Sequence, residues 1–155
     1  MKILVTGAAG YIGSILVPTL LQRGYEVTAL DSFMYNQSTL LDCCHDEKLK
    51  IVRGDARDED LIAKCLKSAD VIFPLACLTG APLCAKDPVG AKSTNLDAIK
   101  MLLSHRSKDQ RIIFPNTNSG YGIGEKGKLC TEDTPMRPIT LYGKLKVEAE
   151  KSILE

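Results

Sequence analysis

Most of the fold follows from one stretch, Ile3-Leu4-Val5-Thr6-Gly7-Ala8-Ala9-Gly10-Tyr11-Ile12-Gly13, in which an apolar run passes directly into glycines spaced G-x-x-G-x-x-G. The apolar run is typical of a buried strand, and a helical pattern follows it to about Gln22. Glycine takes the backbone conformations of a tight turn and has no side chain to hold a ligand away from the chain. We therefore expect a strand, a close turn and a helix here.

The glycine turn favours a bound anion. Free N–H groups at the start of a helix carry the partial positive end of the helix dipole, so a phosphate is stabilised there. The first interval is one residue longer than in the G-x-G-x-x-G fingerprint of dinucleotide-binding folds, and either spacing alone is a weak signal. Its context makes a dinucleotide pyrophosphate the expected ligand.

An acidic residue follows the glycine turn at a spacing that is typical of dinucleotide-binding folds. Arg23-Gly24 predicts the end of the helix, and residues 25–30 a second strand that ends at Asp31. Asp31 lies eighteen residues after Gly13, close to the offset at which such folds place a carboxylate on the adenosine ribose 2′-hydroxyl. It predicts a preference for NAD over NADP, because a 2′-phosphate would be repelled and Ser32-Phe33-Met34-Tyr35 offers no Arg or Lys. The alternative is a glycine-rich turn with a solvated aspartate and no ligand.

Strands and helices alternate along the rest of the chain. Further strands are predicted at residues 50–53, 70–76 and 110–115, and helices at 59–67, 91–104 and 142–154. This order, with continuous apolar strands, predicts an α/β fold with a doubly wound parallel sheet. Pro74 cannot donate to a sheet hydrogen bond, so we expect regular pairing to end there.

Composition narrows the class of protein. The 155 residues, 45% of them hydrophobic, fit one domain with a substantial core, and a net charge of +1 favours neither nucleic acid nor a membrane surface as a partner. The first residues are too short in their apolar part for a signal peptide or a membrane span. The six cysteines include no C-x-x-C pair, so we expect reduced cytoplasmic thiols and no metal site, although Cys43-Cys44-His45 offers part of a ligand set.

Two later segments carry side chains able to do chemistry. Asn116-Thr117-Asn118-Ser119-Gly120-Tyr121-Gly122 follows the last predicted strand, where ligands of open parallel sheets lie; a polar turn is the alternative. Tyr142 and Lys146 are four residues apart on a predicted helix, so both can reach one pocket. A nearby cation favours the phenolate and would make Tyr142 a proton acceptor. The alternative is a solvated helix face with ordinary charges.

Together these segments make the chain resemble the extended short-chain dehydrogenase/reductases, in particular the NAD-dependent nucleotide-sugar epimerase/dehydratase group. The resemblance runs nearly end to end, through residues 6–13, Asp31, residues 54–58, 75–77, Asn95, residues 117–122, 131–135, Tyr142 and Lys146. It implies a Rossmann fold with NAD as cofactor and a nucleotide-sugar as substrate.

The resemblance also implies a role for each matching residue. Gly7, Gly10, Tyr11, Ile12 and Gly13 would surround the pyrophosphate, Asp31 would bind the adenosine ribose with Ser32 as a further cofactor contact, Asp55 and Ala56 would flank the adenine, and Leu75, Ala76 and Cys77 would line the path of the dinucleotide. Tyr142 would be the catalytic base and Lys146 would hold the nicotinamide ribose. Thr117 would hydrogen-bond the reacting sugar hydroxyl, and Asn95 would order local structure.

Departures from the family pattern narrow the set of reactions that we expect. Dehydratases of this group carry an Asp-Glu pair where this chain has Asn118 and Ser119, so an epimerase is favoured over a dehydratase or a reductase of the same family. Pro74 replaces a frequent His and Leu145 a frequent Ser, and neither is given a role.

Family members continue for about as long again. The chain is therefore expected to be an NAD-binding Rossmann domain at residues 1–155, truncated before the last strands and the substrate lobe of a homodimeric cytoplasmic enzyme. A non-catalytic NAD-binding module or sensor subunit is the alternative.

Overall fold

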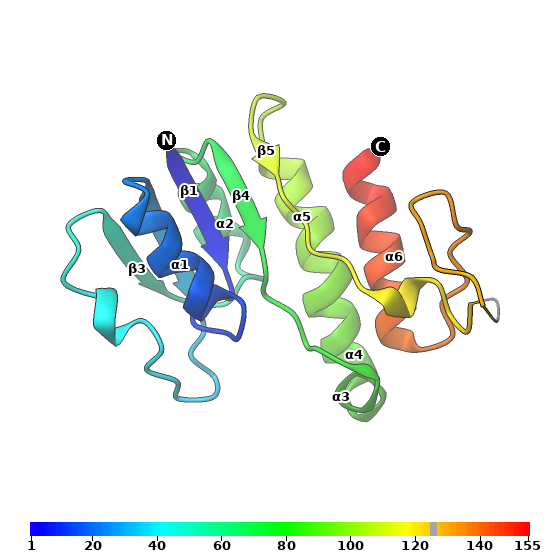
Figure 1. Cartoon of the computed structure of the whole chain (residues 1–155). Coiled ribbons are helices and arrows are strands. Elements are labelled where there is room, and N and C mark those ends of the chain that lie inside the picture. The colour runs from blue at the N-terminus through cyan, green and yellow to red at the C-terminus, as the bar shows by residue number, and fades with distance from the viewer. Residues whose placement is uncertain (125–126) are drawn as a thin grey trace. The chain divides into compact units, whose positions relative to one another are not determined.

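The computed structural model describes residues 1–124 and 127–155 (Figure 1). The chain forms two compact units, the first made of Met1–Cys77 and Met101–Phe114 and the second of Leu78–Lys100 and Pro115–Glu155. The first unit contains the whole of the observed sheet. The second contains helices and the loops that join them.

The sheet of the first unit is parallel and has the strand order β3-β2-β1-β4-β5 (Figure 1). Its strands are β1 (Lys2–Thr6), β2 (Glu26–Asp31), β3 (Leu49–Arg53), β4 (Val71–Pro74) and β5 (Arg111–Ile112). The chain proceeds outward from β1 to β3 and then returns to the other side of β1 at β4. The strand order therefore reverses between β1 and β4, the place where ligands of such sheets bind.

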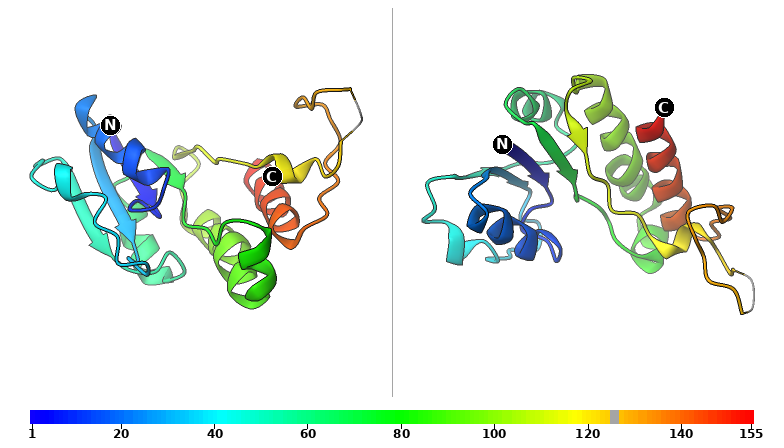
Figure 2. Two further views of the ribbon diagram at one scale, coloured as in Figure 1. Left: turned by 60° about the horizontal axis from the view of Figure 1, so that its bottom comes forward. Right: turned by 45° about the horizontal axis from the view of Figure 1, so that its top comes forward.

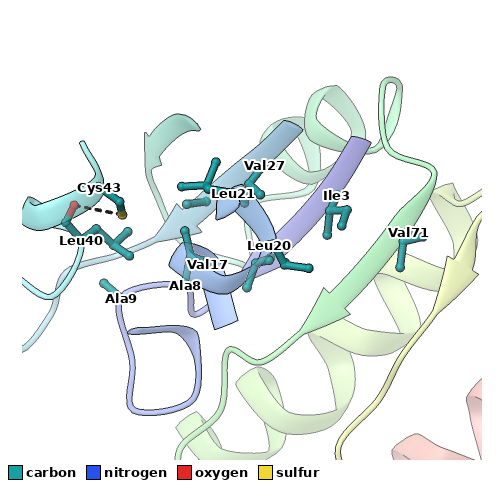
Figure 3. Close-up of a cluster of buried hydrophobic side chains, with 12 residues drawn as sticks. Ile3, Ala8, Ala9, Val17, Leu20, Leu21, Val27, Leu40, Cys43 and Val71 are labelled. Carbon is teal, nitrogen blue, oxygen red and sulfur yellow. Dashed lines mark hydrogen bonds between the residues drawn. The ribbon is translucent and has the colours of Figure 1, made fainter. Parts of the chain in front are cut away.

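Helices cover both faces of this sheet, which confirms the doubly wound prediction. Alternate residues of a strand point to opposite faces, and two separate clusters of buried side chains result. On one face α1 (Gly13–Gln22) packs Val17, Leu20 and Leu21 against Ile3, Val5, Val27 and Ala29 (Figure 3). On the other face α2 (Glu59–Leu66) and Leu102 pack against Leu4, Leu30 and Ile72.

The strand after α2 ends as the sequence predicted, but the last strand is shorter than predicted. β4 ends at Pro74, and the Leu75 N–H donates to Thr6 O at 3.0 Å. β5 pairs only with β4 and covers two residues, where six were expected. The Ile113 N–H still donates to Ile72 O at 2.9 Å, but Pro74 at the end of β4 has no N–H to donate to a further bond.

The helix predicted at 91–104 begins earlier. It consists of α4 (Pro88–Lys92), a π-helical turn η2 (Ser93–Asp97) and α5 (Ala98–His105). The carboxylate of Asp87 accepts from the Gly90 N–H at 2.9 Å, and Pro88 occupies the first helical position, where proline is favoured. A short helix α3 (Ala81–Lys86) was missed by the sequence analysis.

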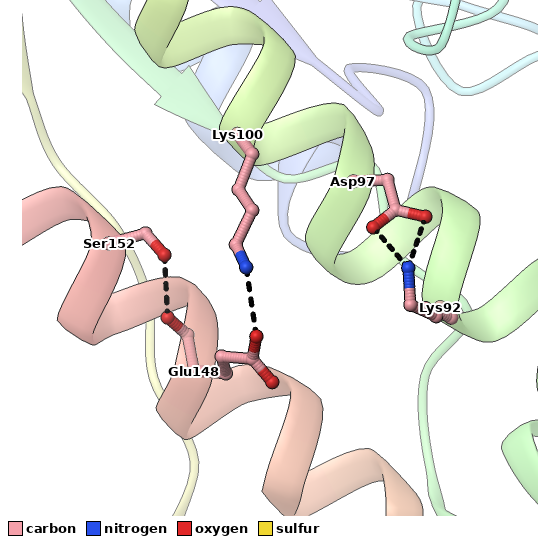
Figure 4. A network of polar contacts seen from close by, with 5 residues as sticks. All are labelled: Lys92, Asp97, Lys100, Glu148 and Ser152. Carbon is pink, nitrogen blue, oxygen red and sulfur yellow. Dashed lines mark hydrogen bonds and ion pairs between the residues drawn. The ribbon is translucent and has the colours of Figure 1, made fainter.

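The second unit is built around α6 (Leu141–Leu154), which begins one residue earlier than predicted. It packs beside α3, α4, η2 and the short helix η3 (Asn118–Gly120) (Figure 2). On the solvent side Lys100 Nζ bonds Glu148 Oε1 at 2.8 Å, and Lys92 bonds Asp97 (Figure 4). These pairs are exposed and screened by salt, so they contribute little to stability.

Two further findings concern the described part of the chain. None of its helices is long and apolar enough to cross a membrane. All six cysteines are free thiols, and the described residues bring together no group of three His, Cys, Asp or Glu side chains that could hold a metal ion.

Leu4→Ala tests the core of the first unit. Leu4 is fully buried in the centre of β1, so its truncation should lower the free energy of unfolding by about 2–5 kcal/mol. Leu41→Ala is the matched control, because Leu41 is 63% exposed and its loss should change stability by less than about 0.5 kcal/mol. Urea denaturation of both variants measures the difference, and equal effects would contradict the packing described.

Candidate cofactor-binding and catalytic sites

At two of the three loop glycines, Gly7 and Gly13, neighbouring backbone leaves no room for a side chain. Gly7 has φ +65°, and a Cβ on it would lie 2.6 Å from Ala76 N. A Cβ on Gly13 would overlap Ala8 O. The loop after β1 therefore lies directly against the segment that follows β4, at the reversal of strand order.

Gly10 differs from the other two. Its φ is not in the left-handed region, and among the described residues beyond its chain neighbours only Gly7 O, at 3.1 Å, lies within 4 Å of an added Cβ. Beside it, the exposed residues Tyr11 and Ile12 lead into α1. Among the described residues no acceptor meets the backbone N–H groups of Tyr11 and Ile12. These donors at the start of a helix fit the predicted pyrophosphate site.

Asp31 connects the glycine loop to the end of β2. Its buried carboxylate accepts from the Ala9 N–H on Oδ2 at 2.9 Å and from the Phe33 N–H on Oδ1 at 2.7 Å. Gln37 Nε2 lies 3.4 Å from Oδ1. The sequence analysis gave Asp31 a ligand role only, and the structure adds that Asp31 positions the loop. Ser32, the next residue, is exposed.

The predicted adenine contacts lie at the end of the neighbouring strand. The Gly54 N–H donates to Asp31 O at 2.9 Å, which brings Asp55 and Ala56 next to the end of β2. The Asp55 carboxylate accepts from the backbone and side-chain nitrogens of Arg57. These hydrogen bonds lower the pKa of Asp55 below its usual value.

Leu75, Ala76 and Cys77 continue from β4 and are half-buried. The Ala76 N–H donates to Thr6 Oγ1 at 3.3 Å, so this segment is held to the end of β1. All the predicted cofactor residues other than Tyr142 and Lys146 thus lie in the first unit, at or just after the carboxyl ends of β1–β4.

The predicted catalytic residues Thr117, Tyr142 and Lys146 all belong to the second unit. Thr117 caps η3, accepting from the Ser119 N–H at 3.3 Å and donating to Ser119 Oγ at 3.3 Å. Tyr142 is in the first turn of α6, which packs on η3. A Cβ on the intervening Gly143 would lie 2.6 Å from Ser119 O, so glycine permits this close approach. The sequence analysis missed Gly143, whose position next to Tyr142 was its only signal.

The burial of Lys146 argues against the solvated-face alternative. Lys144 and Glu148 are exposed, whereas Lys146 is only 5% exposed. A buried ammonium needs polar partners to offset its lost hydration, and Lys146 does interact with other residues. Asn95 is also buried and bonds both backbone groups of Leu78, at 2.8 and 2.9 Å. It orders local structure, as expected.

The variant Gly10→Ala tests whether the space beside Gly10 is needed by a ligand rather than by the folded chain. We expect this variant to keep its fold and to lose NAD affinity by about tenfold or more, because a methyl group would occupy the space of a phosphate. Gly7→Ala is the contrasting variant and should unfold at lower denaturant, since its Cβ meets backbone atoms. Calorimetric titration with NAD and urea denaturation give the two readouts, and unchanged affinity in Gly10→Ala would contradict a phosphate at this position.

Comparison with known proteins identifies the family. The profile of the NAD dependent epimerase/dehydratase family matches residues 3–155. The chain therefore belongs to this family.

Individual relatives agree with this assignment. The UDP-glucose 4-epimerase of Lactobacillus helveticus is 33% identical over an alignment of 155 positions, which covers 97% of this chain and 46% of the relative. The UDP-glucuronic acid 4-epimerase of Bacillus cereus, solved with UDP-glucuronic acid and NAD, is 31% identical with a TM-score of 0.88, over 98% of this chain and 51% of that one. The dTDP-glucose 4,6-dehydratase DesIV of Streptomyces venezuelae, solved with NAD and TYD, is 30% identical with a TM-score of 0.90, over 98% and 50%. The chain spans about half the length of these relatives.

Proposed function

We propose that this chain is the NAD-binding part of a nucleotide-sugar epimerase that transiently oxidises a sugar hydroxyl. The observation that carries the proposal is the junction at Asp31, where a buried carboxylate joins the glycine loop to the end of β2. The same loop carries the N–H groups of Tyr11 and Ile12, which meet no acceptor among the described residues. A carboxylate for the ribose and free N–H donors for the pyrophosphate are the features that a dinucleotide requires.

In this proposal NAD lies across the carboxyl edge of the sheet. Gly7, Gly10, Tyr11, Ile12 and Gly13 surround the pyrophosphate, Asp31 and Ser32 the adenosine ribose, Asp55 and Ala56 the adenine, and Leu75, Ala76 and Cys77 line the path beyond β4. The close packing of Gly7 on Ala76 supports one continuous binding edge. The solved relatives that hold NAD support the choice of cofactor.

The chemistry that NAD supplies when bound is acceptance of a hydride. Tyr142 takes the proton of the sugar hydroxyl as general base. Lys146 holds the nicotinamide ribose and favours the phenolate of Tyr142. Thr117 bonds the reacting hydroxyl, and its 3.3 Å contact with Ser119 Oγ is longer than an ordinary O–H···O bond, so it can be exchanged for a substrate contact.

Asn118 and Ser119 favour epimerisation over 4,6-dehydration, because neither offers a group that titrates as an acid or base for loss of water. We further propose that residues 1–155 form the NAD-binding domain of a longer protein that adds further strands and a substrate lobe. That protein would be a cytoplasmic homodimer whose partner is a nucleotide-sugar, with neither nucleic acid nor a membrane as a ligand. The free thiols of the chain are consistent with a reducing compartment.

Asp31→Asn tests the cofactor preference. We expect the unmodified chain to bind NAD more tightly than NADP, and the variant to narrow this difference by about tenfold, because the charge that repels a 2′-phosphate is gone. Asparagine keeps one oxygen for the Ala9 or Phe33 N–H, so the loop is less disturbed than in an alanine variant. Asp109→Asn, at an exposed turn, is the control. Calorimetric titration measures all affinities, and equal binding of NAD and NADP by the unmodified chain would refute the role of Asp31.

Tyr142→Phe tests the catalytic assignment in a longer protein that includes the substrate lobe. Turnover should fall by about 10²–10⁴-fold, because only the proton acceptor is removed, while NAD affinity should change less than about twofold, since phenylalanine keeps the packing of the ring. Tyr25→Phe, in the first unit, controls for loss of a hydroxyl elsewhere. A Tyr142→Phe enzyme with normal turnover would disprove the mechanism. No turnover in the unmodified protein would favour a non-catalytic NAD-binding module.

A further inference from the structure

Ala9, in the middle of the glycine loop, is held at both of its backbone groups by side chains from distant parts of the sequence. Its N–H donates to Asp31 Oδ2 at 2.9 Å. Its carbonyl oxygen accepts from Thr39 Oγ1 at 2.7 Å, and these two residues are 30 positions apart. Because a peptide group is planar, Asp31 and Thr39 together fix the orientation of the two peptide groups that flank the Ala9 Cα.

The segment between Asp31 and Thr39 turns back toward the glycine loop. The Phe33 N–H donates to Asp31 Oδ1 at 2.7 Å, and the Asn36 N–H donates to Phe33 O at 3.0 Å. Phe33 and Asn36 have φ of +53° and +52°, a region that residues other than glycine adopt rarely. Such backbone persists only where the surrounding contacts favour it. The contacts at its two ends, on Asp31 and on Ala9, therefore hold this turn in place.

Leu40 anchors the end of the turn in the core. Its side chain is buried in the same cluster as Ala8 and Ala9 (Figure 3), and the short helix η1 (Leu41–Cys43) follows it directly. Thr39 itself is exposed. Its hydroxyl, rather than burial of its side chain, is therefore what connects Thr39 to the glycine loop.

The peptide group that Thr39 holds leads directly to the free donors of the loop. Since the peptide is planar, fixing the Ala9 carbonyl also fixes the direction of the Gly10 N–H, which donates to a carbonyl of the same loop at 3.0 Å. The next two N–H groups along the chain, those of Tyr11 and Ile12, meet no acceptor among the described residues. Their directions follow from the peptide plane that Thr39 holds.

We propose that Thr39 is a positioning residue of the glycine loop: its hydrogen bond to the Ala9 carbonyl keeps the two free N–H groups directed at the pyrophosphate. This inference rests on the proposed function, in which that loop binds the pyrophosphate. One hydrogen bond between neutral groups adds little net stability to a fold. Donors that are aligned before the ligand arrives, however, spare the cost of ordering them on binding. The Thr39 hydroxyl therefore acts on affinity for the pyrophosphate more than on folding.

The test compares ADP with adenosine, which differ only by the pyrophosphate. In calorimetric titration Thr39→Val should weaken the binding of ADP by about fivefold, the effect of one lost neutral hydrogen bond, and that of adenosine by less than about twofold. Thr39→Ser keeps the hydroxyl and should bind ADP within about twofold of the unmodified chain.

Thr19→Val is the matched control. The Thr19 hydroxyl also donates to a backbone carbonyl at 2.7 Å, that of Ile15 within α1, so this variant removes the same kind of hydrogen bond outside the glycine loop. The ratio of the ADP and adenosine affinities should stay unchanged. Thermal unfolding of each variant confirms that the compared proteins are folded.

The outcomes separate this inference from the proposed cofactor site. If Thr39→Val weakens ADP and adenosine by the same factor, Thr39 supports only the local structure and the inference is wrong. Unchanged ADP binding in Thr39→Val would also overturn the inference, while leaving the pyrophosphate site in place. If the unmodified chain binds ADP no more tightly than adenosine, the glycine loop holds no pyrophosphate, and both the inference and the proposed cofactor site fail.

Discussion

The hydrogen bond from the Ala9 N–H to the buried carboxylate of Asp31 is the interaction on which the arrangement of the carboxyl edge of the first unit's sheet depends. It joins the glycine loop after β1 to the end of β2, and the carbonyl of the same aspartate accepts from Gly54 at the end of β3. Charge-assisted bonds in a buried setting are among the stronger ones. One residue therefore sets the positions of the loop and of the turn that carries Asp55.

The arrangement of the second unit depends on two helix caps and on a glycine where two helices approach closely. Thr117 and Thr140 cap η3 and α6 with their own hydroxyls, and Gly143 lets the first turn of α6 approach η3. These local features bring the segments of Thr117 and Tyr142 together. Lys146 lies one helical turn after Tyr142, on the buried side of α6. The four-residue spacing between them therefore places Lys146 on the side of the helix that packs against its neighbours.

Several features were predictable because their causes are local in sequence. Periodicity gave the strands and helices, Pro74 gave the end of β4, and Asp58 gave the cap of α2. The errors have separate causes. β5 is short because Pro74, which ends β4, has no N–H to donate to a further sheet hydrogen bond. The helix from Pro88 begins where Asp87 can cap it, a local signal that the sequence analysis overlooked. Nothing in the sequence alone paired Arg57 with Asp55 rather than with solvent.

The sequence by itself determined the parallel α/β architecture, the order of its elements and the identity of the candidate site residues, because hydrophobic period and glycine spacing act over a few residues. The tertiary structure decided which of those residues have a second task. Asp31 holds Ala9, twenty-two residues away, and Gly7 meets Ala76. Such contacts depend on how strands distant in sequence align in the sheet, and no pattern of short range encodes that alignment.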